Sequence, residues 1–238
     1  MQRRTVLKSM AAVSGGLAVA GCLGDTLETT GNGGGNTPTE TPVHSENVTL
    51  AHPSDYPTSY SPEFLSWDDQ LPDVSVTAPL EDRSIALGDL DVPAVFTFFF
   101  SNCKTVCPVL VSSLREIQTH ASNNGYDDEI ALVPITFDPE RDTADRLRTY
   151  AEEMNVDADA DNWHFLRPDS VEKAKSVIQD EFGVRFKKQS QQEGEGYMFD
   201  HRSLIVLTNA AGYVERAYRG SEPQTERIIE DLETVRTQ

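Results

Sequence analysis

The stretch VPAVFTFFFSNCKTVCP, residues 92–108, joins a continuous apolar run to a pair of cysteines. The run is rich in Val, Thr and Phe, which predicts a strand that is buried on both faces. Cys103 and Cys107 follow it, where a helix is predicted to begin. Their four-residue spacing places both sulfurs on one helical face, and a helix N-terminus favours thiolate over thiol. Because a thiolate is both a metal ligand and a redox nucleophile, the stretch indicates one of these two chemistries.

The rest of the chain alternates between strand and helix patterns and ends in a hairpin and a helix. The helix that holds the cysteines is expected to continue to about residue 123. Further strands are predicted at residues 84–90, 130–137, 163–166, 204–208 and 213–218, and further helices at 143–154, 171–182 and 225–235. The polar stretch 187–196 has no period and predicts an exposed loop. This order is typical of an α/β protein with a thioredoxin-like fold.

The N-terminus has the pattern of an export signal. Arg3 and Arg4 form a twin arginine, and the apolar stretch that follows is too short to span a bilayer. Small residues precede Cys22, which we expect to be lipidated. Residues 1–21 are therefore predicted to be a twin-arginine lipoprotein signal peptide. Cys22 would anchor the exported protein to the outer face of the cytoplasmic membrane.

A flexible tether is predicted to separate this anchor from the folded domain. The sequence after Cys22 is rich in Gly, Thr, Asn and Pro, a composition that does not hold a fixed backbone. We assign residues 22–75 to the tether and an N-terminal extension, and residues 76–238 to a single thioredoxin-like domain.

The charge of the chain excludes one large class of partners. The formal net charge is −19, and the acidic residues are spread along the whole sequence. No basic patch is present to hold phosphates, so we expect no binding to nucleic acid. Evenly spread acidity is also typical of halophilic proteins, whose surfaces stay soluble in concentrated salt.

His201 is the candidate for a third ligand. It comes just before the predicted strand at 204–208, and in a thioredoxin-like fold the loop before that strand passes close to the cysteine helix. Two thiolates and one imidazole form a soft site that suits copper(I), and a further weak ligand would admit copper(II). Zinc would also accept this donor set. The alternatives without a bound metal are a weakly stabilising disulfide and a pair of buried thiols.

Three segments of the chain resemble the signature segments of the Sco/SenC family. They are CKTVCP at residues 103–108, FDPERDT at 137–143 and DHRS at 200–203, and they occur in the same order as in the family. The resemblance extends from about residue 78 to the C-terminus. It implies a membrane-tethered, thioredoxin-like metallochaperone that delivers copper to the CuA centre of a cytochrome c oxidase. It also implies Cys103, Cys107 and His201 as the copper ligands, and the CuA-bearing subunit as the partner.

The sequence leaves two questions open. The first is whether the protein is instead a membrane-tethered thiol–disulfide oxidoreductase, in which Cys103 and Cys107 keep the cysteines of the CuA site reduced. The CxxxC spacing and the lack of a proline before His201 argue against a general oxidoreductase. The second is the role of Asp138, which either forms the turn before Pro139 or supports the site from a second layer.

Overall fold

The predicted buried strand lies at the centre of the molecule. In the computed structural model it is β3 (Ala94–Phe99), and all of its residues are buried. It belongs to a sheet in the order β4-β3-β7-β8, with β4 at Ala131–Thr136, β7 at Leu204–Thr208 and β8 at Val214–Arg219. β3 pairs with β4 in parallel and with β7 antiparallel, and β7 and β8 form the predicted hairpin. The sequence predicted all four strands.

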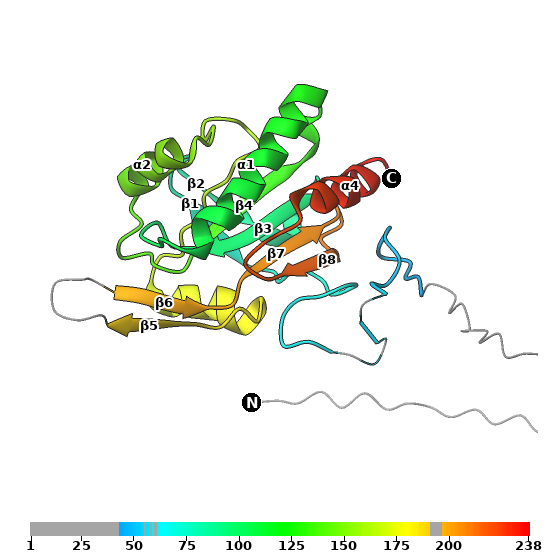
Figure 1. Cartoon of the computed structure of the whole chain (residues 1–238), viewed down its shortest axis with the longest axis horizontal. Coiled ribbons are helices and arrows are strands. Elements are labelled where there is room, and N and C mark those ends of the chain that lie inside the picture. The colour runs from blue at the N-terminus through cyan, green and yellow to red at the C-terminus, as the bar shows by residue number, and fades with distance from the viewer. Residues whose placement is uncertain (1–42, 55, 58, 60, 191–196) are drawn as a thin grey trace, which may run out of the picture. The chain divides into compact units, whose positions relative to one another are not determined.

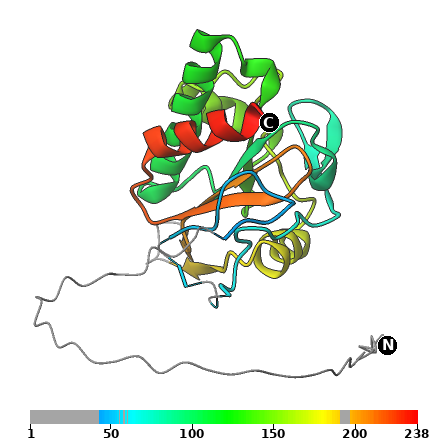
Figure 2. The same cartoon turned by 90° about the vertical axis from the view of Figure 1, so that its right-hand side faces the viewer.

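Helices cover both faces of this sheet. α1 (Val106–Asn124) and α4 (Thr225–Arg236) lie together on one face, and α2 (Ala144–Met154) lies beside α1 (Figure 1). A helix drawn in yellow lies on the other face (Figure 2). It begins as α3 (Val171–Ala174) and continues as the π-helical segment η3 (Lys175–Glu181), so the predicted helix at 171–182 has two hydrogen-bonding patterns. The arrangement is thioredoxin-like, as predicted.

The prediction of a loop at 187–196 was wrong for its first residues. β5 (Phe186–Ser190) pairs antiparallel with β6 (Tyr197–His201) in a separate two-stranded sheet. Phe186 and Lys188 point to the same face of this hairpin, and the Lys188 ammonium lies 3.7 Å from the centre of the Tyr197 ring. Lys188 therefore stands where an apolar residue would continue the alternation begun by Phe186, although its side chain stays exposed, and this hides the strand pattern.

Short elements complete the fold. β1 (Ser75–Ala78) and β2 (Arg83–Ala86) form an antiparallel pair, so the strand predicted at 84–90 is confirmed only for residues 84–86. Two 3₁₀ turns follow at Leu87–Asp89 and Asp127–Glu129. Residues 163–166 do not form the predicted strand, because only Trp163 and Leu166 bridge to β4.

The structure describes residues 43–190 and 197–238, except residues 55, 58 and 60. The predicted signal peptide, Cys22 and most of the predicted tether lie outside these residues, as does the rest of the predicted loop at 191–196. The described residues belong to one compact unit, Thr41–Gln238. Across these described ranges, none of the helices has both the length and the apolar character that crossing a bilayer requires.

The extension before β1 packs against the domain. The buried carboxylate of Glu215 accepts hydrogen bonds from the backbone amides of Thr49 and Leu50, both at 2.8 Å. Phe64 is buried in the core, and its backbone passes close to Gly183. Gly183 has a φ of +69°, and a Cβ there would lie 1.8 Å from the carbonyl oxygen of Glu63. Only glycine fits this approach, which holds the extension against the end of η3.

Candidate metal centre

The two cysteines lie on either side of the start of α1. Cys103 is in the loop before the helix, and Cys107 is the second helical residue. The prediction that both lie on one helical face is therefore corrected, because the turn that carries Cys103 is closed by its own amide bonding to the Phe100 carbonyl at 3.1 Å. The backbone amide of Cys107 donates to the Cys103 sulfur at 3.5 Å. Pro108 falls in the first turn of α1, where a missing amide costs no helical hydrogen bond.

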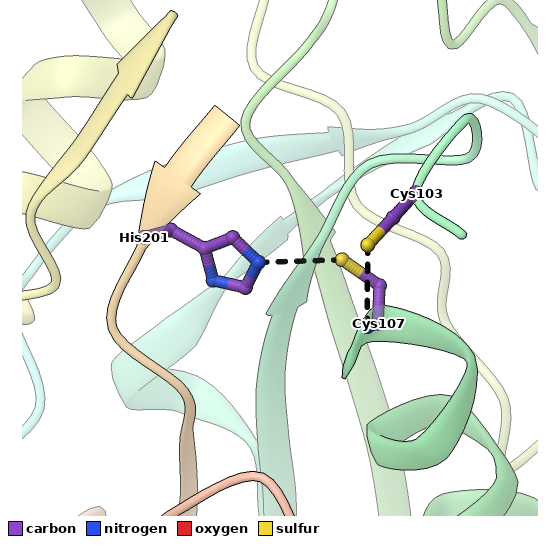
Figure 3. Close-up of side chains that lie close together, drawn as sticks. All are labelled: Cys103, Cys107 and His201. Atoms are coloured by element: carbon purple, nitrogen blue, oxygen red, sulfur yellow. Dashed lines mark hydrogen bonds between the residues drawn. The ribbon is translucent and has the colours of Figure 1, made fainter. Parts of the chain in front are cut away.

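His201 reaches this pair from the end of β6. Its Nε2 lies 3.5 Å from the Cys107 sulfur, and its Nδ1 lies 3.3 Å from the carbonyl oxygen of Arg202. The imidazole points from its strand toward the cysteines (Figure 3). The two sulfurs and a ring nitrogen all lie within 4.8 Å of one another. The structure therefore brings Cys103, Cys107 and His201 together, although 94 residues separate His201 from Cys107.

The two thiols differ in acidity. The pKa of Cys103 is lowered, chiefly by the hydrogen bond between its sulfur and the Cys107 side chain, while burial opposes the shift. Bonds from His201 and Thr105 lower this pKa further. Burial raises the pKa of Cys107, and the neighbouring Cys103 raises it again. Cys103 is therefore the more acidic thiol of the pair.

Aromatic side chains form a dry wall behind His201. The His201 ring packs against Phe137, with ring centres 4.9 Å apart. Phe137 is itself in contact with Phe100, Phe186 and Phe199, each with ring centres between 5.0 and 5.4 Å away. This wall excludes water on one side of the imidazole, so the ring has few alternative positions.

Asp138 is buried, with 1% of its surface exposed, but it faces the hairpin. Its Oδ2 accepts a hydrogen bond of 2.5 Å from the Tyr197 hydroxyl and lies 3.7 Å from Nε of Arg141. Its backbone carbonyl also closes the turn, because it accepts from the amides of Arg141 and Asp142. Asp138 thus forms the turn considered from the sequence, and its carboxylate contacts β6 through Tyr197.

Sequence reasoning missed Asp142, the second aspartate of the FDPERDT segment. It is fully buried, and its carboxylate accepts from the Ser101 amide at 3.1 Å, from the Ser101 hydroxyl at 2.5 Å and from the Thr136 hydroxyl. Burial raises the pKa of Asp142. The only signal in the sequence was its place in a signature segment, since Ser101 lies 41 residues away.

The donor set fits a soft metal ion. Two sulfurs and an imidazole nitrogen converge, and neither cysteine is in a disulfide. Thiolate ligands select copper(I) or zinc over hard cations such as magnesium and calcium. Within the described residues, this is the one group of at least three His, Cys, Asp or Glu side chains placed to share a metal ion.

Comparison with known proteins identifies the family. A family model described as SCO1/SenC matches residues 90–237. The chain belongs to the SCO1/SenC family. It is 28% identical over 141 residues to an SCO1 protein homolog of Bacillus subtilis, a match that covers 59% of this chain and 69% of that relative. Four SCO2-like proteins of Rickettsia species match over 56 to 58% of their length.

Solved Sco structures share the fold. A SCO1/SenC family lipoprotein from Bacillus anthracis is 25% identical, with a TM-score of 0.58 over 72% of this chain and 96% of that one. BsSco, a member of the Sco family of cytochrome c oxidase assembly proteins in which a disulfide switch was identified, has a TM-score of 0.57 at 22% identity, over 73% and 96%. ScoI of Bradyrhizobium japonicum with copper bound has a TM-score of 0.55 at 20% identity, over 70% and 99%.

Proposed function

We propose that this protein is a copper metallochaperone that delivers copper to the CuA centre of a cytochrome c oxidase during assembly. The observation that carries the proposal is the convergence of Cys103, Cys107 and His201, a soft donor set that suits copper(I). Membership of the SCO1/SenC family supports it, because relatives bind copper and assist cytochrome c oxidase assembly.

In this proposal the three side chains have different roles in binding copper. Cys103 and Cys107 supply negative charge and soft sulfur, and His201 completes the site from a different segment of the chain. Cys103 and Cys107 are at most 3% exposed, whereas His201 is half-buried and lines an open groove with Arg185, Lys187 and Arg202. A partner would therefore reach the metal from the His201 side, and exchange of the imidazole for a partner's ligand would begin release.

The place of action follows from the N-terminus. A lipid on Cys22 would hold the domain at the outer face of the cytoplasmic membrane, where the CuA-bearing subunit of the oxidase would be the partner. The relative from Bacillus anthracis supports this placement, because it is itself a lipoprotein. The predicted tether would let the domain reach a membrane-bound partner.

A second function rests on the acidity of the cysteines. A lowered pKa at Cys103 makes it the attacking thiolate of a thiol–disulfide oxidoreductase. Cys103 would attack a partner's disulfide to form a mixed disulfide, and Cys107 would then displace the partner's second thiolate. The partner would leave as a dithiol, and this protein would keep the Cys103–Cys107 disulfide until an external dithiol reduced it. Such a reaction would keep the CuA-site cysteines reduced.

Complementation of a strain without this gene distinguishes the two functions. A carrier needs all three side chains, whereas a dithiol reductase needs only Cys103 and Cys107. We expect oxidase assembly to fail in this strain and to recover partly with excess copper. His201→Ala should then fail to restore assembly at normal copper. Full rescue by His201→Ala, with no rescue by either cysteine variant, would establish the reductase and refute the carrier.

A further inference from the structure

One turn is attached to both halves of the metal centre. We infer that the turn from Asp138 to Asp142 is a bracket that sets the distance between the cysteine pair and the His201 imidazole. Asp142 holds the loop of Cys103, and Asp138 holds β6 through Tyr197. The inference rests on the proposed copper site and assigns Asp142 and Tyr197 as its positioning residues.

The cysteine arm of the bracket is a buried network around Ser101. The Asp142 carboxylate accepts from both the amide and the hydroxyl of Ser101, two residues before Cys103. Arg146 completes the network, because its guanidinium donates to the Ser101 hydroxyl at 2.9 Å and to the Ser101 carbonyl at 2.8 Å. The amide, the hydroxyl and the carbonyl of Ser101 are therefore all hydrogen-bonded to Asp142 or Arg146, which lie outside the cysteine loop. A buried network satisfied in this way holds its members in a single geometry.

The histidine arm runs through a single hydroxyl. Tyr197, Phe199 and His201 alternate along β6 and point to the same face. The Tyr197 hydroxyl donates to Asp138 and accepts from Nε of Arg141 at 2.9 Å. Burial and the bond to Asp138 raise the pKa of Tyr197 to about 12, so the hydroxyl keeps the proton that it donates.

The hairpin needs such an attachment. Among the described strands, β6 pairs only with β5, and this pair is separate from the central sheet. The contacts of Phe199 and His201 with Phe137 are apolar and allow sliding, whereas a hydrogen bond to a buried carboxylate fixes position and direction. Tyr197 therefore fixes where His201 lies along its strand.

Thr136 joins the two arms at the end of β4. Its hydroxyl donates to Asp142 and accepts from the amide of Asp138 at 3.0 Å. Both ends of the turn are therefore fixed to the central sheet through one side chain. The cysteine loop and the histidine strand are thus positioned against the same rigid point.

Hydrogen exchange of the metal-free protein tests the bracket without copper. In Tyr197→Phe, amides of residues 197–202 should exchange about tenfold faster, because one hydrogen bond to a charged group is lost, while residues 101–107 should be unchanged. Asp142→Asn should give the reverse pattern. Tyr218→Phe is the matched control for the first variant, because its hydroxyl donates to Asp231 at 2.7 Å away from the site. Asp69→Asn is the control for the second, because Asp69 accepts from the amide and hydroxyl of Ser66.

Loss of copper(I) to a chelator gives the second readout. Tyr197→Phe should release copper about tenfold faster than wild type, but it should add nothing in a His201→Ala background. Asp142→Asn should accelerate release in both backgrounds. The bracket is refuted if either variant loosens both segments equally, or if both match their controls. A wild-type protein that binds no copper would refute the proposed function, while hydrogen exchange would still decide the bracket.

Discussion

Replacing His201 with alanine should separate copper affinity from stability. The side chain is half-buried, and its main packing contact is the Phe137 ring. Loss of one aromatic contact costs about 0.5–1.5 kcal/mol. Its Nε2 contact with the Cys107 sulfur, at 3.5 Å, involves a weak hydrogen-bonding atom, and its Nδ1 contact, at 3.3 Å, is long, so both add little. We therefore expect the free energy of unfolding to fall by about 1–2 kcal/mol, which lowers the melting temperature by about 2–8 °C.

The effect on copper should be much larger. Removal of a residue that only supports a metal ligand typically costs about 10–100-fold in affinity, so loss of one of three direct ligands should cost about 100-fold or more. The assay is competition for copper(I) against a chelator of known affinity, with a melting curve recorded on the same samples.

His120→Ala is the matched control for this experiment. His120 is also half-buried, its ring centre lies 5.8 Å from that of Tyr126, and its Nδ1 lies 2.7 Å from the Tyr126 hydroxyl. It should lose similar stability and keep full copper affinity. If His201→Ala kept the copper affinity of His120→Ala and only melted lower, the imidazole would be structural and the reasoning would be refuted.

Three further predictions concern Gly183, the cysteine pair and Cys22. Gly183→Ala should lower the free energy of unfolding by at least about 2 kcal/mol in a urea titration, because its φ is +69° and the new Cβ would meet the Glu63 carbonyl; an unchanged midpoint would contradict this. Iodoacetamide at pH 6 should modify Cys103 much faster than Cys107, because the lowered pKa of Cys103 keeps it deprotonated at a pH where an ordinary thiol is protonated. Equal modification rates on peptide mapping would count against this prediction. Cys22→Ala should move the protein to the soluble fraction with copper binding unchanged, and a variant that stays with the membrane would disprove the lipid anchor.

The sequence predicted the central sheet because three of its four strands, β3, β4 and β7, are buried on both faces. β3 and β4 are continuous apolar runs, and the β7–β8 hairpin has a Gly-containing turn, so each pattern is local. The hairpin β5–β6 was not predicted, because Lys188 covers the Tyr197 ring with its ammonium and breaks the apolar alternation. Whether β5 forms depends on contacts with β6, such as that of Lys188 with Tyr197, which amino-acid composition does not reveal.

Part of the candidate metal centre was predicted because its sequence signal is local. Cys103 and Cys107 form a local motif, and the predicted fold class places the loop of His201 near them. The role of Asp142 depends instead on Ser101 and Thr136, which lie on other elements. Hydrogen bonds between distant segments leave no pattern in the sequence, so the attachment of both arms to one turn required the structure.

Titration of the reduced protein with copper tests the central claim most directly. We expect one copper per chain, and a copper(II) form with intense thiolate-to-metal charge-transfer absorption, because two sulfurs and one imidazole converge within 4.8 Å. The variant with Cys103→Ala and Cys107→Ala should bind no copper at this site and lose the absorption. Equal binding by wild type and this double variant would contradict the account.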